Sequence, residues 1–198
     1  MTQQDLSADL LSLASPRRGH FRLESGHHAN LWLDLDGLFV QPALLRPFVT
    51  RLARALRPHK VAGVCGPLVG GAFLAQLLAS ALKAEFFFTE RVPGEGDGLY
   101  QAQYHLPPAA RGRVRDKRLA IVDDAISAGS AVRASYAELQ GHGAEPVVIG
   151  ALLVLGTAAS PYFAERGVPI EAVTRVPFDL WVPAECPLCA SGQALADP

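Results

Sequence analysis

The hydrophobic pattern of the first sixty residues predicts two helices with a strand between them. Leucines at helical spacing over residues 6–13 predict an opening helix. Leucines alternate with polar or aromatic residues over 31–36, which predicts a half-buried strand. Apolar positions over 44–56 then predict an amphipathic helix entered at Pro42, with Pro47 near its first turn, where a missing N–H does least harm.

The rest of the chain contains five short apolar runs without clean alternation, as expected of strands buried on both faces. Helix-like stretches separate most of these runs. This order predicts an α/β fold, a parallel-sheet core with flanking helices on each side. The predicted strands are 61–65, 85–89, 119–122, 147–154 and 170–175, and the predicted helices are 72–82, 131–140 and 160–166.

Residues 91–117 interrupt this regular order. The segment is rich in Gly and Pro and contains a possible strand pair around Tyr100–Tyr104 and Arg113–Arg115. We expect a hairpin or flap inserted into the core. Because the chain has 198 residues and no low-complexity linker, we expect one domain over 1–198, with its core at about 41–176.

Composition and charge exclude several classes of protein. Apolar residues make up 49% of the chain and charged residues 19%, which excludes a disordered protein. The formal net charge of −1 argues against whole-surface binding to nucleic acid or to an anionic membrane. The N-terminus lacks the basic start of a signal peptide, and the longest apolar run, 147–156, is too short to span a bilayer. We expect a cytoplasmic protein with neither a nucleic-acid nor a membrane partner.

Three cysteines do not make the disulfide framework of a secreted protein. Cys186 and Cys189 form a single C-x-x-C motif. Zinc needs four ligands, which Cys65 or a partner chain would have to complete. We therefore interpret the motif as a structural or incidental pair.

The segment 119–132 carries the most informative chemistry. Four apolar residues end in Asp123 and Asp124, followed by a loop of small residues and a helix. In an open α/β sheet, ligands bind beyond the carboxyl ends of the strands. Backbone N–H groups of such a loop and the following helix N-terminus attract an anion. The carboxylates suit hydroxyl groups or a magnesium ion.

The anion-binding loop and the carboxylate pair together fit a ribose 5-phosphate, which carries a phosphate and vicinal hydroxyls. The alternative is an ordinary strand, acidic turn and helix cap, with Ser127 or Ser130 as the capping residue. The other common phosphate motif, G-x-x-x-x-G-K-[ST], is absent from the sequence, which argues against a nucleoside triphosphatase.

The same string resembles the phosphoribosyl pyrophosphate (PRPP) signature of type I phosphoribosyltransferases. Four further segments resemble the orotate branch of that family in the expected order. They are the N-terminal stretch 19–28, the pyrophosphate loop 65–71, the strand 87–91 leading into a mobile loop, and the tail 181–189 of some bacterial members. The resemblance implies a small hood built from about 1–40 and 177–198, and a flap at about 91–117.

The resemblance also implies an activity. Such an enzyme transfers ribose 5-phosphate from PRPP to a base, here expected to be orotate, and yields orotidine 5′-phosphate and pyrophosphate for pyrimidine nucleotide synthesis. Mg²⁺ would accompany PRPP, and a homodimer is expected. Two alternatives stay open: the same chemistry on another base, or a non-catalytic module that senses PRPP or a nucleotide. The flap favours the second alternative, because no lysine lies between Lys83 and Lys117.

The family's site residues carry over to matching positions of this chain. The implied catalytic residues are Asp123, Asp124 and Arg91, with the aspartates on the ribose hydroxyls and also able to hold magnesium, and Arg91 facing the pyrophosphate. The implied PRPP-binding residues are these two aspartates with Ala125, Ile126, Ser127, Ala128, Gly129, Ser130, Ala131, Gly66, Pro67, Gly70 and Gly71. The implied base-binding residues are Ser25, His28 and Ser127.

The chain departs from the family where an arginine usually grips orotate, just after the strand that follows the signature helix. Leu155, Gly156 and Thr157 stand there instead. The remaining candidates to neutralise the orotate carboxylate are His28, Arg22 or backbone N–H groups near Ser127.

Overall fold

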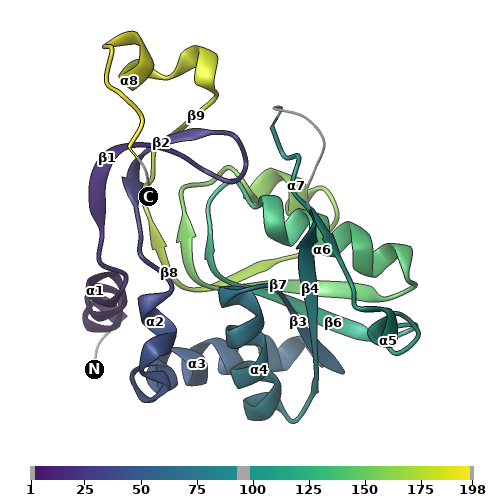
Figure 1. The fold of residues 1–198 in the computed structure, drawn as a ribbon. Helices are drawn as coiled ribbons and strands as arrows, with labels where there is room; N and C mark the ends of the chain where they lie inside the picture. Colours follow the sequence, from purple (N-terminus) through teal and green to yellow (C-terminus); the bar gives the residue numbers. More distant parts are fainter. Residues whose placement is uncertain (1–2, 93–98, 197–198) are drawn as a thin grey trace.

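A six-stranded sheet forms the centre of the molecule (Figure 1). The computed structural model describes residues 3–92 and 99–196. The strand order is β5-β4-β3-β6-β7-β8, and all neighbours except β5 pair in parallel, as predicted. The strands are β3 (Gly63–Pro67), β4 (Glu85–Val92), β5 (Gln103–His105), β6 (Arg118–Ile126), β7 (Glu145–Leu155) and β8 (Ile170–Val176).

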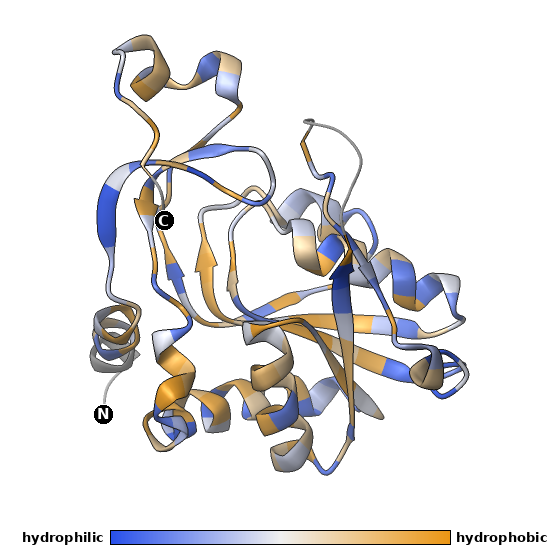
Figure 2. Ribbon diagram, viewed as in Figure 1, coloured by the Kyte–Doolittle hydropathy of each residue, from blue (hydrophilic) through white to orange (hydrophobic). Residues whose placement is uncertain are grey.

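Helices cover both faces of this sheet, which confirms the predicted α/β fold (Figure 1). The covering helices are α3 (Pro42–Leu56) and α4 (Gly70–Leu82) on one face and α6 (Ser130–Gly141) and α7 (Ser160–Ala164) on the other. Neighbouring residues of a strand point to opposite faces of the sheet. Val122 therefore packs in the core beneath α3 and α4, and Ile121 packs in the core beneath α6 and α7. Because both faces of the central strands are buried, β3 and β7 are almost wholly apolar, whereas β4, β5 and β8 also carry polar residues (Figure 2).

A second, smaller sheet lies above the carboxyl ends of the core strands, and we call it the hood sheet (Figure 1). It consists of β1 (Arg17–Arg22), β2 (His28–Trp32) and β9 (Leu180–Trp181) in antiparallel order. The N-terminal helix α1 (Gln3–Leu13) precedes it, as predicted. The remaining elements are α2 (Gly37–Val40), α5 (Pro108–Arg111), α8 (Pro187–Ala190) and the 3₁₀ turns η1 (Arg57–His59) and η2 (Pro183–Glu185).

Two sequence predictions about these outer segments need correction. The strand predicted at 31–36 is His28–Trp32 instead, because the chain then turns so that the Asp34 N–H donates to the Ala14 carbonyl before α2 begins. The hairpin predicted in the flap is β4 and β5, with Arg91 opposite Tyr104. Residues 93–98 of the predicted flap lie outside the described residues.

The strand predicted at Arg113–Arg115 is wrong. That segment continues the turn at the end of α5, where the N–H groups of Arg113 and Val114 both donate to the Ala110 carbonyl. Val114 is fully buried, so the apolar signal in this segment reflects core packing. Within the described part of the chain, no helix is long and apolar enough to cross a membrane.

Candidate active site

A cavity of about 950 Å³ lies between the hood sheet and the carboxyl ends of the core strands. This is where open α/β sheets bind ligands. The predicted PRPP-binding residues that line it are Pro67, Gly70, Asp123, Asp124, Ala125, Ser127, Gly129, Ser130 and Ala131. The structure therefore brings the predicted pyrophosphate loop and the predicted phosphate loop to one site.

Asp123 and Asp124 sit near the end of β6, and Asp124 is buried. Their carboxylates accept local backbone hydrogen bonds: Asp124 N–H donates to Asp123 Oδ1 at 3.1 Å, and Ala125 N–H donates to Asp124 Oδ1 at 2.7 Å. Burial raises the pKa of Asp124 to about 6. Burial and the neighbouring Asp124 charge raise the pKa of Asp123 well above its ordinary range. Hydrogen-bond donors or a cation placed beside these two carboxyl groups would favour the loss of their protons.

The loop before α4 lies directly against these carboxylates. A Cβ placed on Gly70 would stand 1.8 Å from Asp124 Oδ2, and one on Gly71 would stand 2.7 Å from Asp123 Oδ1. Only glycine permits this approach of backbone to carboxylate. Gly66 and Gly71 are buried and support the loop without lining the cavity.

The predicted phosphate loop leads from β6 into α6. Gly129 precedes the helix with a φ of +81°, a left-handed conformation that favours glycine. Ser127, Ser130 and Ala131 line the cavity around it. Ile126 and Ala128 are fully buried in the core beneath, so they hold the loop from behind.

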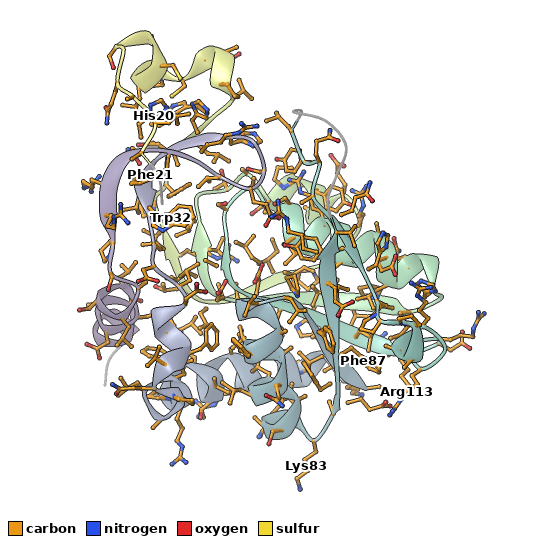
Figure 3. All side chains as sticks on the ribbon, in the orientation of Figure 1. His20, Phe21, Trp32, Lys83, Phe87 and Arg113 are labelled. Atoms are coloured by element: carbon orange, nitrogen blue, oxygen red, sulfur yellow. The ribbon has the colours of Figure 1, made fainter. Side chains whose placement is uncertain are left out.

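The cavity wall carries both apolar and acidic residues. The apolar lining includes Leu31, Trp32 and Leu33, together with Leu155 and Phe178. Figure 3 labels Trp32, the last residue of the hood strand β2. The acidic and basic residues among the described lining are Glu24, Asp34, Asp36, Asp123, Asp124 and Arg17. Five carboxyl groups against one guanidinium make the described lining strongly acidic.

Glu24 contacts residues of three segments that are far apart in the sequence. Its carboxylate accepts hydrogen bonds from the Tyr104 hydroxyl at 3.1 Å and from the Ser130 hydroxyl at 3.2 Å. Arg91 Nε lies 3.8 Å from it. The hood, the flap hairpin and the phosphate loop thus meet at one side chain, and burial with the Glu24 charge raises the pKa of Tyr104.

Three predicted site residues lie elsewhere. Arg91 does not line the cavity; its largely exposed side chain lies beside Glu24, so a role at the pyrophosphate stays a prediction. Ser25 is buried with its hydroxyl 3.1 Å from His27 Nδ1. His28 points away from the cavity toward His20 and Cys189. Neither Ser25 nor His28 is among the lining residues, because local contacts hold both side chains, and their role at the base stays a prediction.

The buried Asp124 carboxyl group makes the free energy of unfolding depend on pH. Its pKa rises on folding from 3.8 to about 6, so the folded state loses stability as pH rises through that interval. Asp124→Asn removes this cost. We expect the free energy of unfolding of the variant, minus that of wild type, to grow by about 2–3 kcal/mol between about pH 4 and pH 7.

Denaturant unfolding across this pH range measures that difference. The matched control is Asp116→Asn, an exposed aspartate with a φ of +59° that Asn tolerates. If the difference in free energy of unfolding between Asp124→Asn and wild type stays constant with pH, the assignment of a raised pKa is contradicted.

Comparisons with known proteins identify the family of the chain. A profile of the phosphoribosyl transferase domain family matches residues 49–183. The orotate phosphoribosyltransferase of Carboxydothermus hydrogenoformans is 31% identical over 182 residues, covering 91% of this chain and 88% of that protein. The solved orotate phosphoribosyltransferase from Aeropyrum pernix has a TM-score of 0.65 at 21% identity, covering 86% of this chain and 93% of that one.

An adenine phosphoribosyltransferase from Rhodothermus marinus has an equal TM-score of 0.65 at 20% identity, covering 86% of this chain and 99% of that one. Likeness of fold alone therefore does not select the base.

Proposed function

The chain belongs to the phosphoribosyl transferase domain family, and from that premise we propose that it is an orotate phosphoribosyltransferase. This pentosyltransferase transfers ribose 5-phosphate from PRPP to orotate, forming orotidine 5′-phosphate and pyrophosphate in cytoplasmic pyrimidine nucleotide synthesis. Residues 1–198 act as one domain. The observation that carries the proposal is the meeting of the Asp123–Asp124 pair, the Gly70 loop and the Ser127–Ala131 loop in one cavity. Near-full-length similarity to an orotate enzyme supports the choice of base.

PRPP would bind across the three elements. Backbone N–H groups of the loop 127–131 and the N-terminus of α6 face its 5-phosphate. Asp123 and Asp124 accept hydrogen bonds from the ribose hydroxyls, which favours their ionised forms and so lowers their raised pKa values on binding. The Gly70–Gly71 backbone lies beside the same carboxylates, where the pyrophosphate would lie.

The acidic lining fits a magnesium ion that arrives with PRPP. Asp123 and Asp124 would hold it, with Asp34 and Asp36 also on the cavity wall. When bound, Mg²⁺ neutralises charge on the departing pyrophosphate. Without a cation, five carboxyl groups would repel so anionic a substrate.

Bond breaking at the ribose C1′ gives a transition state like an oxocarbenium ion, which water would capture. The apolar walls of the hood exclude water from this point, and Trp32 offers a flat surface for a planar base. The base nitrogen then attacks C1′ as pyrophosphate leaves with the electron pair of the broken C–O bond.

Arg17 is the basic residue on the described cavity wall, and we expect it to face the orotate carboxylate. It lies on β1 opposite Trp32. Arg17→Gln is expected to raise the KM for orotate about tenfold or more while leaving the KM for PRPP within about twofold. Arg18→Gln is the matched control, because Arg18 is an exposed neighbour on the same strand that does not line the cavity. Equal effects of both substitutions would contradict this role.

A homodimer is the proposed assembly. Val40 on α2 and Phe73 on α4 are exposed apolar side chains. The rings of Phe73 and Phe39 are in contact, with their centroids 5.5 Å apart, so the two helices form one apolar patch. A second copy would cover this patch. Light scattering is expected to give twice the 21.1 kDa chain mass, and Phe73→Asp is expected to shift it toward one chain. A wild-type monomer at micromolar concentration would contradict the proposal.

A turnover assay with PRPP, Mg²⁺ and a panel of bases tests the proposed reaction. Orotate is expected to release pyrophosphate far faster than uracil, adenine or hypoxanthine. Faster use of another base would establish the same chemistry on a different substrate. PRPP binding without turnover on any base would establish a sensing module instead.

A further inference from the structure

Four side chains of the metal-ligating type meet outside the cavity, and we call them the His₂Cys₂ cluster. They are His20 on β1, His28 at the start of β2, and Cys186 and Cys189 in the C-terminal segment around α8. Their ligand atoms all lie within 4.8 Å of one another. Figure 3 shows His20 directly beneath the C-terminal segment. In each of the three histidine–cysteine contacts, the two residues are at least 161 positions apart in the chain.

Three sulfur–nitrogen separations in the cluster are close to those of a tetrahedral metal site. Zinc held by sulfur at about 2.3 Å and nitrogen at about 2.0–2.1 Å separates its ligand atoms by about 3.3–3.8 Å. Cys186 Sγ and Cys189 Sγ lie 3.5 and 3.6 Å from His20 Nε2, and Cys189 Sγ lies 3.2 Å from His28 Nδ1. The two ring nitrogens are 2.9 Å apart and would open by about 0.4 Å around an ion.

Hydrogen bonding alone accounts poorly for this arrangement. His20 Nδ1 lies 2.7 Å from the Gln193 carbonyl oxygen, which can only accept, so Nδ1 carries the proton and Nε2 presents a lone pair. One imidazole lone pair accepts one strong hydrogen bond. Here His28 Nδ1 and both thiols approach that single lone pair. Convergence of electron-pair donors on one point is the arrangement that a cation requires.

The Gln193 contact is also the outer support that metal-binding histidines usually have. A ligating imidazole donates its other N–H to a carbonyl or carboxylate, which fixes the tautomer and the ring orientation. The same segment is held by a second contact, in which Ala196 N–H donates to the His20 carbonyl at 2.7 Å. His20, His28 and Cys186 are buried, and Cys189 is exposed. The site is therefore oriented and mostly shielded.

We propose that His20, His28, Cys186 and Cys189 bind a zinc ion that fastens the C-terminal segment to the hood sheet. Two thiolates and two imidazoles in a tetrahedron select zinc among the common metals. Two thiolates also balance the charge of the ion, which suits a mostly buried position. In this proposal the two histidines, and neither Cys65 nor a partner chain, complete the ligand set of the cysteine pair that we interpreted from the sequence alone as structural or incidental.

The ion has a structural role because four protein ligands leave no open position for a substrate. None of the four ligands lines the cavity. However, β1 and β2 carry Arg17 and Trp32 of the cavity wall, and a three-stranded sheet of this size has little core of its own. Zinc would fix these strands in place above the site.

Metal analysis of the full chain, purified without a histidine tag or chelator, tests the proposal. We expect about one zinc ion per chain by plasma mass spectrometry. Removing it under reducing conditions is expected to lower the melting temperature by about 5 °C or more. Co²⁺ added to the reduced apoprotein is expected to give the visible bands of a tetrahedral site and a thiolate charge-transfer band.

Variants separate this cluster from incidental metal binding. Cys189→Ser, at the exposed position, is expected to lose most of the zinc, whereas Cys65→Ala and His142→Gln are expected to retain it. Cys65 and His142 lie outside the cluster. Zinc below about a tenth of an ion per chain with no cobalt spectrum would overturn the proposal, as would a Cys186–Cys189 disulfide in the freshly purified protein. Equal zinc in Cys189→Ser and wild type would do the same.

Discussion

Replacing Asp123 and Asp124 together by Asn is expected to lower the affinity for Mg²⁺–PRPP at least about 100-fold, because each charge-assisted hydrogen bond contributes about 1.5–3 kcal/mol. The amides keep the size of the carboxylates and can still accept the N–H bonds of Asp124 and Ala125. The fold should therefore persist. At neutral pH the variant should even be more stable than wild type, since burial raises the pKa of both carboxyl groups.

Calorimetric titration with Mg²⁺–PRPP measures the affinity, and thermal unfolding of the same samples measures the stability. Asp116→Asn serves again as the control for an aspartate remote from the cavity. Unchanged PRPP affinity in a folded double variant would show that these carboxylates do not hold the ribose.

Gly129→Val is expected to reduce PRPP affinity by a similar factor. Valine is strained at a φ of +81°, and its Cβ would lie 3.0 Å from Ala159 Cβ, so the loop must move. That movement displaces the backbone N–H groups that face the 5-phosphate. Binding of Mg²⁺–PRPP, and of inorganic phosphate as the simplest anion, is expected to fall at least about 100-fold.

Gly143→Val separates the loss of the anion site from general backbone strain. Gly143 has a nearly equal φ of +79°, but it lies in the turn after α6 and away from the cavity. The two variants should lose comparable stability, and only Gly129→Val should lose the ligand. Phosphate still held by the loop in a crystal of Gly129→Val would contradict the expectation.

The core of the fold was predictable because its signals are local. Strands such as 119–122 are apolar throughout, since one residue packs against each face of the sheet in turn. The Asp123–Asp124 pair and Gly129 were predictable for a related reason. A strand end, a carboxylate pair and a small-residue loop lie within a dozen consecutive residues, so their mutual placement needs no tertiary information.

The rest depends on contacts between segments that are distant in the chain, and local sequence patterns do not predict such contacts. His28 reads as a polar residue near the base, yet its partners are His20 and the cysteines of the C-terminal segment. Glu24 carries no motif, and its role appears only when Tyr104 and Ser130 meet it in space. The C-x-x-C motif marks two candidate metal ligands, but no spacing rule selects His20 and His28 from the six histidines of the chain.

The most direct test of the proposed function follows both products of one reaction. Purified protein is incubated with PRPP, orotate and Mg²⁺. Orotate loss is followed by ultraviolet absorbance, the nucleotide is identified by mass spectrometry, and pyrophosphate is measured with a coupled pyrophosphatase assay. The account predicts one orotidine 5′-phosphate and one pyrophosphate for each orotate consumed, and the loss of both in the Asp123→Asn/Asp124→Asn variant. A folded, PRPP-binding wild-type protein that leaves orotate unchanged would contradict it.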